Sequence, residues 1–235
     1  MSKNSNLNNQ EIQGIIFDVD GLLLDTDFIY SKLDQEILDK YLPETKPKFT
    51  RECAAKLMGR TMLEASQVVI DEYGLPISNY EFVDYMNERL PEKLLTCEEM
   101  PGALRILEWV NENGIKSALA TGDGVRNTTL KLKNKSWKNY YNEKTIITGD
   151  LVSKGKPDPE IFLIAAKAIG VKPENCIVFE DSIQGVKAAI SAGMHIVWIP
   201  EHGMHFEDPP EPTQLLNSLL EFKPTQWCLP DFQEN

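Results

Sequence analysis

The sequence carries little positive charge for its length. Its 235 residues include 24 Lys and Arg against 36 Asp and Glu, which gives a formal net charge of −12. A chain with this balance repels phosphate polymers and anionic lipid surfaces, so we expect no nucleic acid and no membrane as partners. A small anionic ligand stays compatible, because a few Lys residues or a bound cation can reverse the potential in one pocket.

Other features are missing as well. No stretch reaches the roughly 18 uninterrupted apolar residues that a membrane helix needs, and the polar, Asn-rich start has no apolar signal segment. The 4 cysteines lie far apart without a CxxC pair, which argues against a zinc site or a disulfide framework. Heptad repeats are absent too. We therefore expect a cytoplasmic protein with reduced thiols that is a monomer.

Short apolar segments alternate with helical patterns along most of the chain. Five segments are typical of strands buried in a parallel sheet: GIIF from Gly14, KSALAT to Thr121, TII around Ile146, CIVFE to Glu180 and HIVWI to Ile199. Between them, helical patterns open at Pro or Asp-Pro and close at Gly, as from Asp158 to Gly170. This alternation predicts an α/β fold with a doubly wound parallel sheet, that is, a Rossmann-like core.

Residues 28–97 break the alternation, because their apolar positions follow helical spacing without a buried strand. We expect helices over 29–41, 51–58, 62–73 and 80–90, folded as an inserted helical cap. The core then comprises residues 13–27 and 98–235, and residues 1–12 form a disordered tail. After Phe206 we expect a helix flanked by irregular chain.

Residues suited to catalysis, through polar side chains or a backbone amide, follow several of the predicted strands. They are Asp18, Asp20, Thr121, Gly122, Glu180 and Asp181, with Lys156 just before a helix. Ligands of open parallel sheets bind beyond the carboxyl ends of the strands, so we expect these groups to converge. Unit charges of one sign about 4 Å apart repel by roughly 4 kcal/mol at an effective dielectric near 20. Four carboxylates against one Lys therefore predict a bound cation, and oxygen donors without clustered His or Cys favour Mg²⁺.

The same residues fit a phosphoryl-transfer site. A carboxylate is ionised at neutral pH and needs no base to act as a nucleophile, which makes Asp18 the candidate for an aspartyl-phosphate intermediate. Asp20 is the candidate acid/base, protonating the leaving alkoxide and later deprotonating water. Thr121, Gly122 and Lys156 are expected to hold the phosphoryl oxygens.

Four strings in the chain resemble the motifs of one family, the haloacid dehalogenase superfamily phosphatases with a helical cap. They are DVDGLLLDT at 18–26, ATG at 120–122, GKPDPEIF at 155–162 and FEDSIQGVKAA at 179–189. The resemblance implies Asp18 as nucleophile, Asp20 as acid/base, and Thr121 and Lys156 as phosphate ligands. It further implies that Mg²⁺ is held by Asp18, the main-chain oxygen of Asp20 and Asp181, with Glu180 beside it.

The resemblance extends to the cap string LMGRTMLEASQVVIDEYGLPIS and the tail string SLLEFKPTQWCLP, which are similar to the branch acting on pseudouridine 5'-phosphate. It implies a small phosphorylated metabolite as substrate, either that compound or a related small nucleotide. Gly59 and Arg60 lie where relatives place substrate-contacting residues, and Arg suits a planar polar or anionic ligand. An exposed helix-start Arg is the alternative for Arg60. A sugar or polyol phosphate stays open as substrate.

Other functions fit less well. Related hexose-phosphate mutases carry an Arg three residues beyond the cap Gly, where this chain has Met62. True haloacid dehalogenases lack the second Asp of the first motif, which is present here as Asp20. Receiver domains combine Asp, Thr and Lys on a similar sheet but are about half as long and have no helical insert. A non-catalytic binding protein is the remaining alternative, since Asp123 adds a carboxylate beside the proposed phosphate loop. That side chain either turns outward or weakens phosphate binding.

Overall fold

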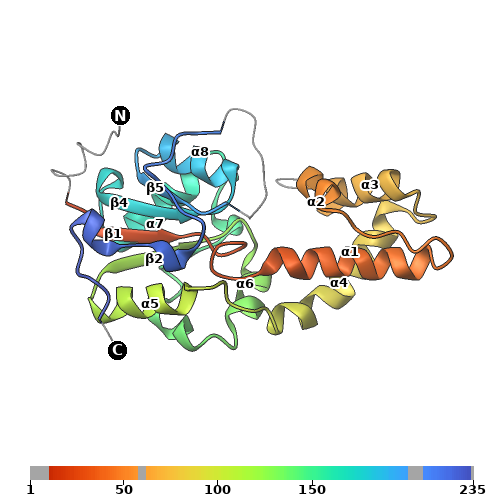
Figure 1. Ribbon diagram of the computed structural model, residues 1–235, viewed down its shortest axis with the longest axis horizontal. Coiled ribbons are helices and arrows are strands. Elements are labelled where there is room, and N and C mark those ends of the chain that lie inside the picture. The colour runs from red at the N-terminus through yellow and green to blue at the C-terminus, as the bar shows by residue number, and fades with distance from the viewer. Residues whose placement is uncertain (1–10, 58–61, 201–208, 234–235) are drawn as a thin grey trace. The chain divides into compact units, whose positions relative to one another are not determined.

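The chain divides into two compact units (Figure 1). The computed structural model describes residues 11–57, 62–200 and 209–233. One unit comprises Met1–Leu24 and Glu98–Asn235, and the other Asp25–Cys97. Residues 1–10 of the expected tail lie outside the described residues, as do Gly59 and Arg60 of the expected substrate contacts.

In the described residues of the larger unit, a parallel sheet has six strands in the order β3-β2-β1-β4-β5-β6. The strands are β1 (Gly14–Phe17), β2 (Lys116–Ala120), β3 (Ile146–Ile147), β4 (Cys176–Glu180), β5 (His195–Trp198) and β6 (Gln214–Leu215). β1 lies in the middle, where Phe17 is in register with Leu119 of β2 and Phe179 of β4. The carboxyl ends of these three strands therefore meet at one edge of the sheet, and the predicted fold class is confirmed.

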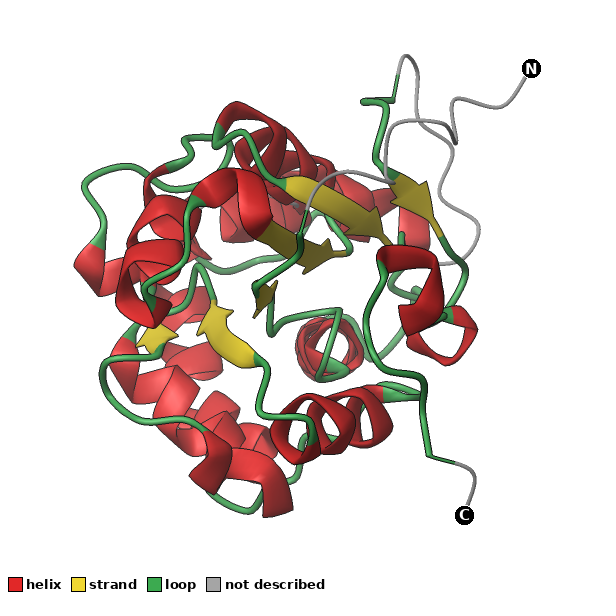
Figure 2. Ribbon diagram, turned by 90° about the vertical axis from the view of Figure 1, so that its left-hand side faces the viewer, coloured by secondary structure: helices red, strands yellow, loops and turns green. Residues whose placement is uncertain are grey.

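Successive strand residues point to opposite faces of the sheet, and both faces are covered (Figure 2). Ile16 and Val178 pack in one apolar cluster with α7 (Glu160–Ile169) and α8 (Ile183–Ser191). On the other face Phe17 stacks on Phe179 at 5.1 Å between ring centroids. The Phe179 and Phe222 rings meet in a T-shaped contact at 4.8 Å between ring centroids. The layers on the two faces bury β1 and β4 along their whole length, as the continuous apolar runs of these strands predicted.

The segment after β5 differs from expectation. Within residues 209–233 it forms β6 and two short 3₁₀ helices, Leu219–Glu221 and Pro224–Trp227, in place of the single helix expected there. Pro224 and Pro230 remove two backbone donors, which prevents a longer helix. The segment packs instead on α5 (Ala103–Glu112), where the Trp109 Nε1–H donates to the carbonyl oxygen of Pro230 at 3.0 Å.

Four helices make up the described part of the second unit: α1 (Thr26–Tyr41), α2 (Arg51–Leu57), α3 (Met62–Tyr73) and α4 (Asn79–Leu95). Contacts join α1 to α4, α4 to α3 and α3 to α2. Ser78 precedes α4 and forms a capping box with Glu81. The Ser78 hydroxyl accepts from the Glu81 N–H, and the Glu81 carboxylate accepts from the Ser78 N–H. The helix predicted over 80–90 continues through Pro91 to Leu95.

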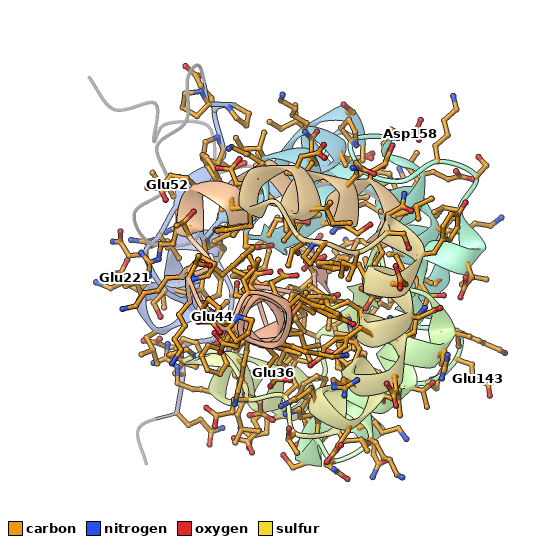
Figure 3. All side chains as sticks on the ribbon, turned by 90° about the vertical axis from the view of Figure 1, so that its right-hand side faces the viewer. Glu36, Glu44, Glu52, Glu143, Asp158 and Glu221 are labelled. Carbon is orange, nitrogen blue, oxygen red and sulfur yellow. The ribbon has the colours of Figure 1, made fainter. Side chains whose placement is uncertain are left out.

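Much of the acidic excess lies at the surface. Glu44, Glu52, Glu143 and Glu221 are exposed and are labelled in Figure 3. Among the described residues, no helix combines the length and the apolar character needed to cross a membrane.

Candidate active site

The carboxyl end of β1 places Asp18 in a buried cluster of charges. Its N–H donates to the carbonyl oxygen of Phe179 at 3.0 Å, which extends the β1–β4 ladder by one bond. The Lys156 ammonium donates to Asp18 Oδ1 and to Glu180 Oε1. The Asp18 and Glu180 side chains are 6% and 0% exposed. Two carboxylates from two strand ends thus share the ammonium group of one loop residue.

The electrostatics of this cluster favour a charged Lys156. Burial alone lowers the pKa of Lys156, but the charges of Asp18 and Glu180 outweigh it and raise that pKa above its ordinary value. Burial raises the pKa of Asp18 well above its usual range, Lys156 opposes this, and the charges of Glu180 and Asp20 add to it. The negative charge of these carboxylates therefore exceeds the positive charge of Lys156. A bound cation would reduce this excess and so stabilise the site.

Glu180 is held from both sides. Its Oε2 accepts hydrogen bonds from the N–H and the hydroxyl of Ser182, at 2.7 and 3.0 Å, while Oε1 accepts from Lys156. Ser182 also caps α8 by accepting from the Gly185 N–H at 3.0 Å. A Cβ on Gly185 would lie 1.7 Å from Glu180 Oε1, so the carboxylate occupies the space of a missing side chain.

Asp20 belongs to a second cluster at the end of β2. Its Oδ2 accepts from the Thr121 hydroxyl at 2.6 Å, and its Oδ1 accepts from the ammonium of Lys131 on α6 (Val125–Leu132). The same ammonium donates to Asp123 Oδ2 at 2.6 Å. The Asp123 carboxylate therefore does not turn outward, and its charge is matched by a buried lysine. Burial and the charge of Asp20 raise the pKa of Asp123, while Lys131 lowers it.

The loop after β2 lies against the loop after β3. The Gly149 N–H donates to the carbonyl oxygen of Asp123 at 2.8 Å. A Cβ on Gly149 would come within 2.2 Å of the carbonyl oxygen of Gly122, so only glycine permits this approach. Gly149 thereby fixes the backbone of Gly122 beside Thr121.

One group of carboxylates in the described part of the chain has the geometry of a metal site. Asp18, Glu180 and Asp181 each offer an oxygen, and these oxygens lie within 4.8 Å of one another. The Trp198 Nε1–H donates to the main-chain oxygen of Asp181 at 2.8 Å and so anchors its backbone. A donor set of oxygens alone fits a hard divalent cation such as Mg²⁺.

Comparison with known proteins places these groups in a family. The sequence model of the family described as "Haloacid dehalogenase-like hydrolase" matches residues 15–199. The chain belongs to the haloacid dehalogenase-like hydrolases. It is 36% identical over 229 residues to a Drosophila melanogaster protein named "Probable pseudouridine-5'-phosphatase", covering 96% of this chain and 97% of that one. It is 35% identical over 231 residues to "(DL)-glycerol-3-phosphatase 1, mitochondrial" of Arabidopsis thaliana, covering 95% and 76%.

A solved structure supports the fold. A HAD family hydrolase from Deinococcus radiodurans with bound phosphate and sodium superposes with a TM-score of 0.74 over 92% of this chain and 96% of that one. At 21% identity it supports the architecture alone. Together with the phosphatase relatives, the family match shows that this haloacid dehalogenase-like hydrolase is a phosphatase.

In this hydrolase the structure brings the predicted site residues together in two clusters. Asp18, Lys156, Glu180 and Asp181 form one, and Asp20 with Thr121 forms the other. Sequence reasoning missed three supporting residues: Lys131, Gly149 and Gly185. Gly185 lies inside the FEDSIQGVKAA string, so the motif could have identified it as a site residue. Lys131 and Gly149 lie outside all four strings.

Proposed function

We propose that this enzyme hydrolyses phosphate monoesters through an aspartyl-phosphate formed on Asp18. The observation that carries the proposal is the placement of Asp18: a buried carboxylate at the end of the central strand, paired with Lys156 in a cluster that otherwise carries excess negative charge. Lys156 can neutralise both the nucleophile and the incoming phosphoryl group, because Coulomb repulsion between two anions is the first barrier to this reaction.

The first step joins Asp18 to phosphorus and breaks the ester P–O bond. The leaving alkoxide takes its proton from Asp20, which becomes a carboxylate. Asp20 then takes a proton from water, whose oxygen attacks phosphorus and breaks the bond to Asp18. Phosphate leaves, and both carboxyl groups return to their starting states.

The remaining groups hold the transferred phosphoryl oxygens. Lys156 supplies charge, Thr121 a hydroxyl, and Gly122 a backbone N–H on a loop fixed by Gly149. The cation, Mg²⁺ in this proposal, would be held by Asp18, Asp181 and the main-chain oxygen of Asp20, with Glu180 beside them. When bound, it neutralises charge on the phosphoryl oxygens.

Turnover should depend on a divalent cation. We expect EDTA to remove phosphate release and Mg²⁺ to restore it, because the carboxylates outnumber the positive charges of this cluster. Asp181→Asn should raise the Mg²⁺ concentration that gives half the maximal rate, measured by titration of the chelated enzyme. Glu143→Gln removes an exposed carboxylate and is the matched control. Full activity in EDTA would contradict the metal assignment.

We further propose pseudouridine 5'-phosphate, or a related small nucleotide, as the substrate. The support is the similarity over 97% of the length of the Drosophila relative that is named for this activity. The nearly equal similarity to a glycerol-3-phosphatase favours a polyol phosphate as the second candidate. In either case we infer that the helical unit Asp25–Cys97 serves as the cap, and that Gly59 and Arg60 contact the substrate.

A panel of phosphate esters separates the two substrates. We expect kcat/KM for pseudouridine 5'-phosphate to exceed that for uridine 5'-phosphate and glycerol 3-phosphate by at least about tenfold, a difference typical of one or two specific pocket contacts. Phosphate release with Mg²⁺ is the measurement. A preference for glycerol 3-phosphate would keep the mechanism and replace the nucleotide. Absence of release from every ester would contradict the proposed hydrolysis.

A further inference from the structure

We propose that Lys131 is a positioning residue for Asp20. It holds the carboxyl group that exchanges protons with the leaving group and with water, and Asp123 is its second counter-charge. The proposal rests on the acid/base role given to Asp20 above. Neither Lys131 nor Asp123 belongs to the groups assigned to the nucleophile, the phosphate or the cation.

The contacts define the orientation of Asp20. Lys131 Nζ donates to Asp20 Oδ1, and Thr121 Oγ1 donates to Asp20 Oδ2 at 2.6 Å. A donor on each oxygen fixes the plane of a carboxylate, because rotation about the bond to Cβ would break both bonds. The Asp20 side chain is 29% exposed and so stays accessible, whereas the Lys131 side chain is 0% exposed.

The hydroxyl of Thr121 cannot perform two tasks at once. It has one proton, which it donates to Asp20, and its oxygen accepts from the Asp123 N–H at 3.1 Å. When Thr121 turns its proton to a phosphoryl oxygen, it releases Asp20 Oδ2. Lys131 then holds Asp20 from the other oxygen, and the acid/base keeps its place during the step that needs it.

Asp123 explains why a lysine can occupy this place. An ammonium buried without a partner costs several kcal/mol, and a buried charge is retained only where carboxylates pair with it. Lys131 has two such partners, Asp20 and Asp123, with Nζ to Asp123 Oδ2 at 2.6 Å. Because Asp123 also holds the ammonium, the place of Lys131 does not depend on Asp20 alone.

A purely structural role is the competing explanation. In that case Lys131 would only tie the loop at Asp123 to α6, and its loss would slow all substrates equally. A positioning role predicts a dependence on the leaving group. An alkoxide needs the proton of Asp20, whereas p-nitrophenolate is stable enough to leave without one.

The test compares an alkyl phosphate, glycerol 3-phosphate, with p-nitrophenyl phosphate, both with Mg²⁺. We compare kcat/KM, which reports the steps up to departure of the leaving group, because a misplaced Asp20 also slows hydrolysis of the shared aspartyl phosphate and so lowers kcat on both esters. We expect Lys131→Met to lower kcat/KM for the alkyl ester by about 10²-fold, the lower range for lost acid catalysis, and kcat/KM for the aryl ester by less than about tenfold. Lys133→Met is the matched control, since Lys133 is exposed and ends the same helix. It should change neither rate. Equal losses on the two esters would overturn the proposal.

A second variant covers the case in which Lys131→Met does not fold. The double variant Asp123→Asn/Lys131→Met removes the stranded charge and should unfold at a higher temperature than the single one, yet keep the selective loss on the alkyl ester. Recovery of alkyl-ester hydrolysis in the double variant would also overturn the proposal. Asp20→Asn gives the reference. If it spares the alkyl ester, the acid/base assignment is at fault, and with it the proposed function.

Discussion

Replacing Asp18 with Asn should abolish phosphate release and leave the fold intact. The amide oxygen is a weak nucleophile and cannot form the acyl phosphate, so we expect kcat to fall on the order of 10⁴-fold or more, as for other lost nucleophiles. Asn has the shape of Asp, and Lys156 keeps Glu180 as a partner.

Stability gives this variant a second readout. Burial and the neighbouring carboxylates raise the pKa of Asp18, so its ionised form is disfavoured in the folded protein. A raised carboxyl pKa costs stability at any pH above the unfolded value, and the neutral Asn avoids that cost. We therefore expect the unfolding temperature in metal-free buffer at neutral pH to stay equal or rise. Glu143→Gln should change neither quantity, and a rate within tenfold of wild type would remove Asp18 as nucleophile.

Gly185→Ala should be the most damaging change outside the reacting groups. The added methyl would lie 1.7 Å from Glu180 Oε1, so the carboxylate must leave the N-terminal end of α8. Glu180 would lose its bonds to Ser182 and to Lys156, and both partners are part-buried. We expect a loss of about 3 kcal/mol in unfolding free energy, at the upper end for overpacking, together with most of the activity because Lys156 is displaced.

A double-mutant cycle tests the cause of this loss. In a Glu180→Ala background the space beside Gly185 is empty, so adding Gly185→Ala should cost little further stability. Denaturant unfolding of the four proteins measures the coupling. Ser191→Ala, at the exposed end of the same helix, is the control for helix effects. Additive losses would show that the methyl group acts elsewhere than on Glu180.

The sequence predicted the parts of the fold that depend on local patterns. CIVFE coincides with β4 at Cys176–Glu180, and the helix predicted over 62–73 coincides with α3. A strand covered on both faces needs an unbroken apolar run, which is visible without knowledge of its neighbours. The four motif strings predicted which residues follow the strands. The ends of β1 and β4 place Asp18 and Glu180 at one edge of the sheet.

The support of the site could not be predicted in the same way. Lys131 lies in a helix that the pattern did not predict, and a buried lysine has the same letter as a solvated one. The burial of Lys131 follows from two carboxylates, one of them 111 positions earlier in the chain. The sequence left two orientations open for the Asp123 side chain for the same reason, because its contact with Lys131 decides between them. Gly149 is required only because the Gly122 carbonyl group approaches it from another loop.

The contact of Phe222 with Phe179 has a consequence for synthesis of the protein. Phe179 lies on β4, yet Phe222, which packs on it, leaves the ribosome only after α8 and β5 have been made. A nascent chain that stops before residue 219 would lack the Phe222 ring and leave part of Phe179 uncovered on one face of the sheet. Such a face is the kind of surface that chaperones bind and that aggregates form on. Synthesis past Phe222 thus also conceals this part of the sheet, and products that stop earlier would be distinguishable by that exposure.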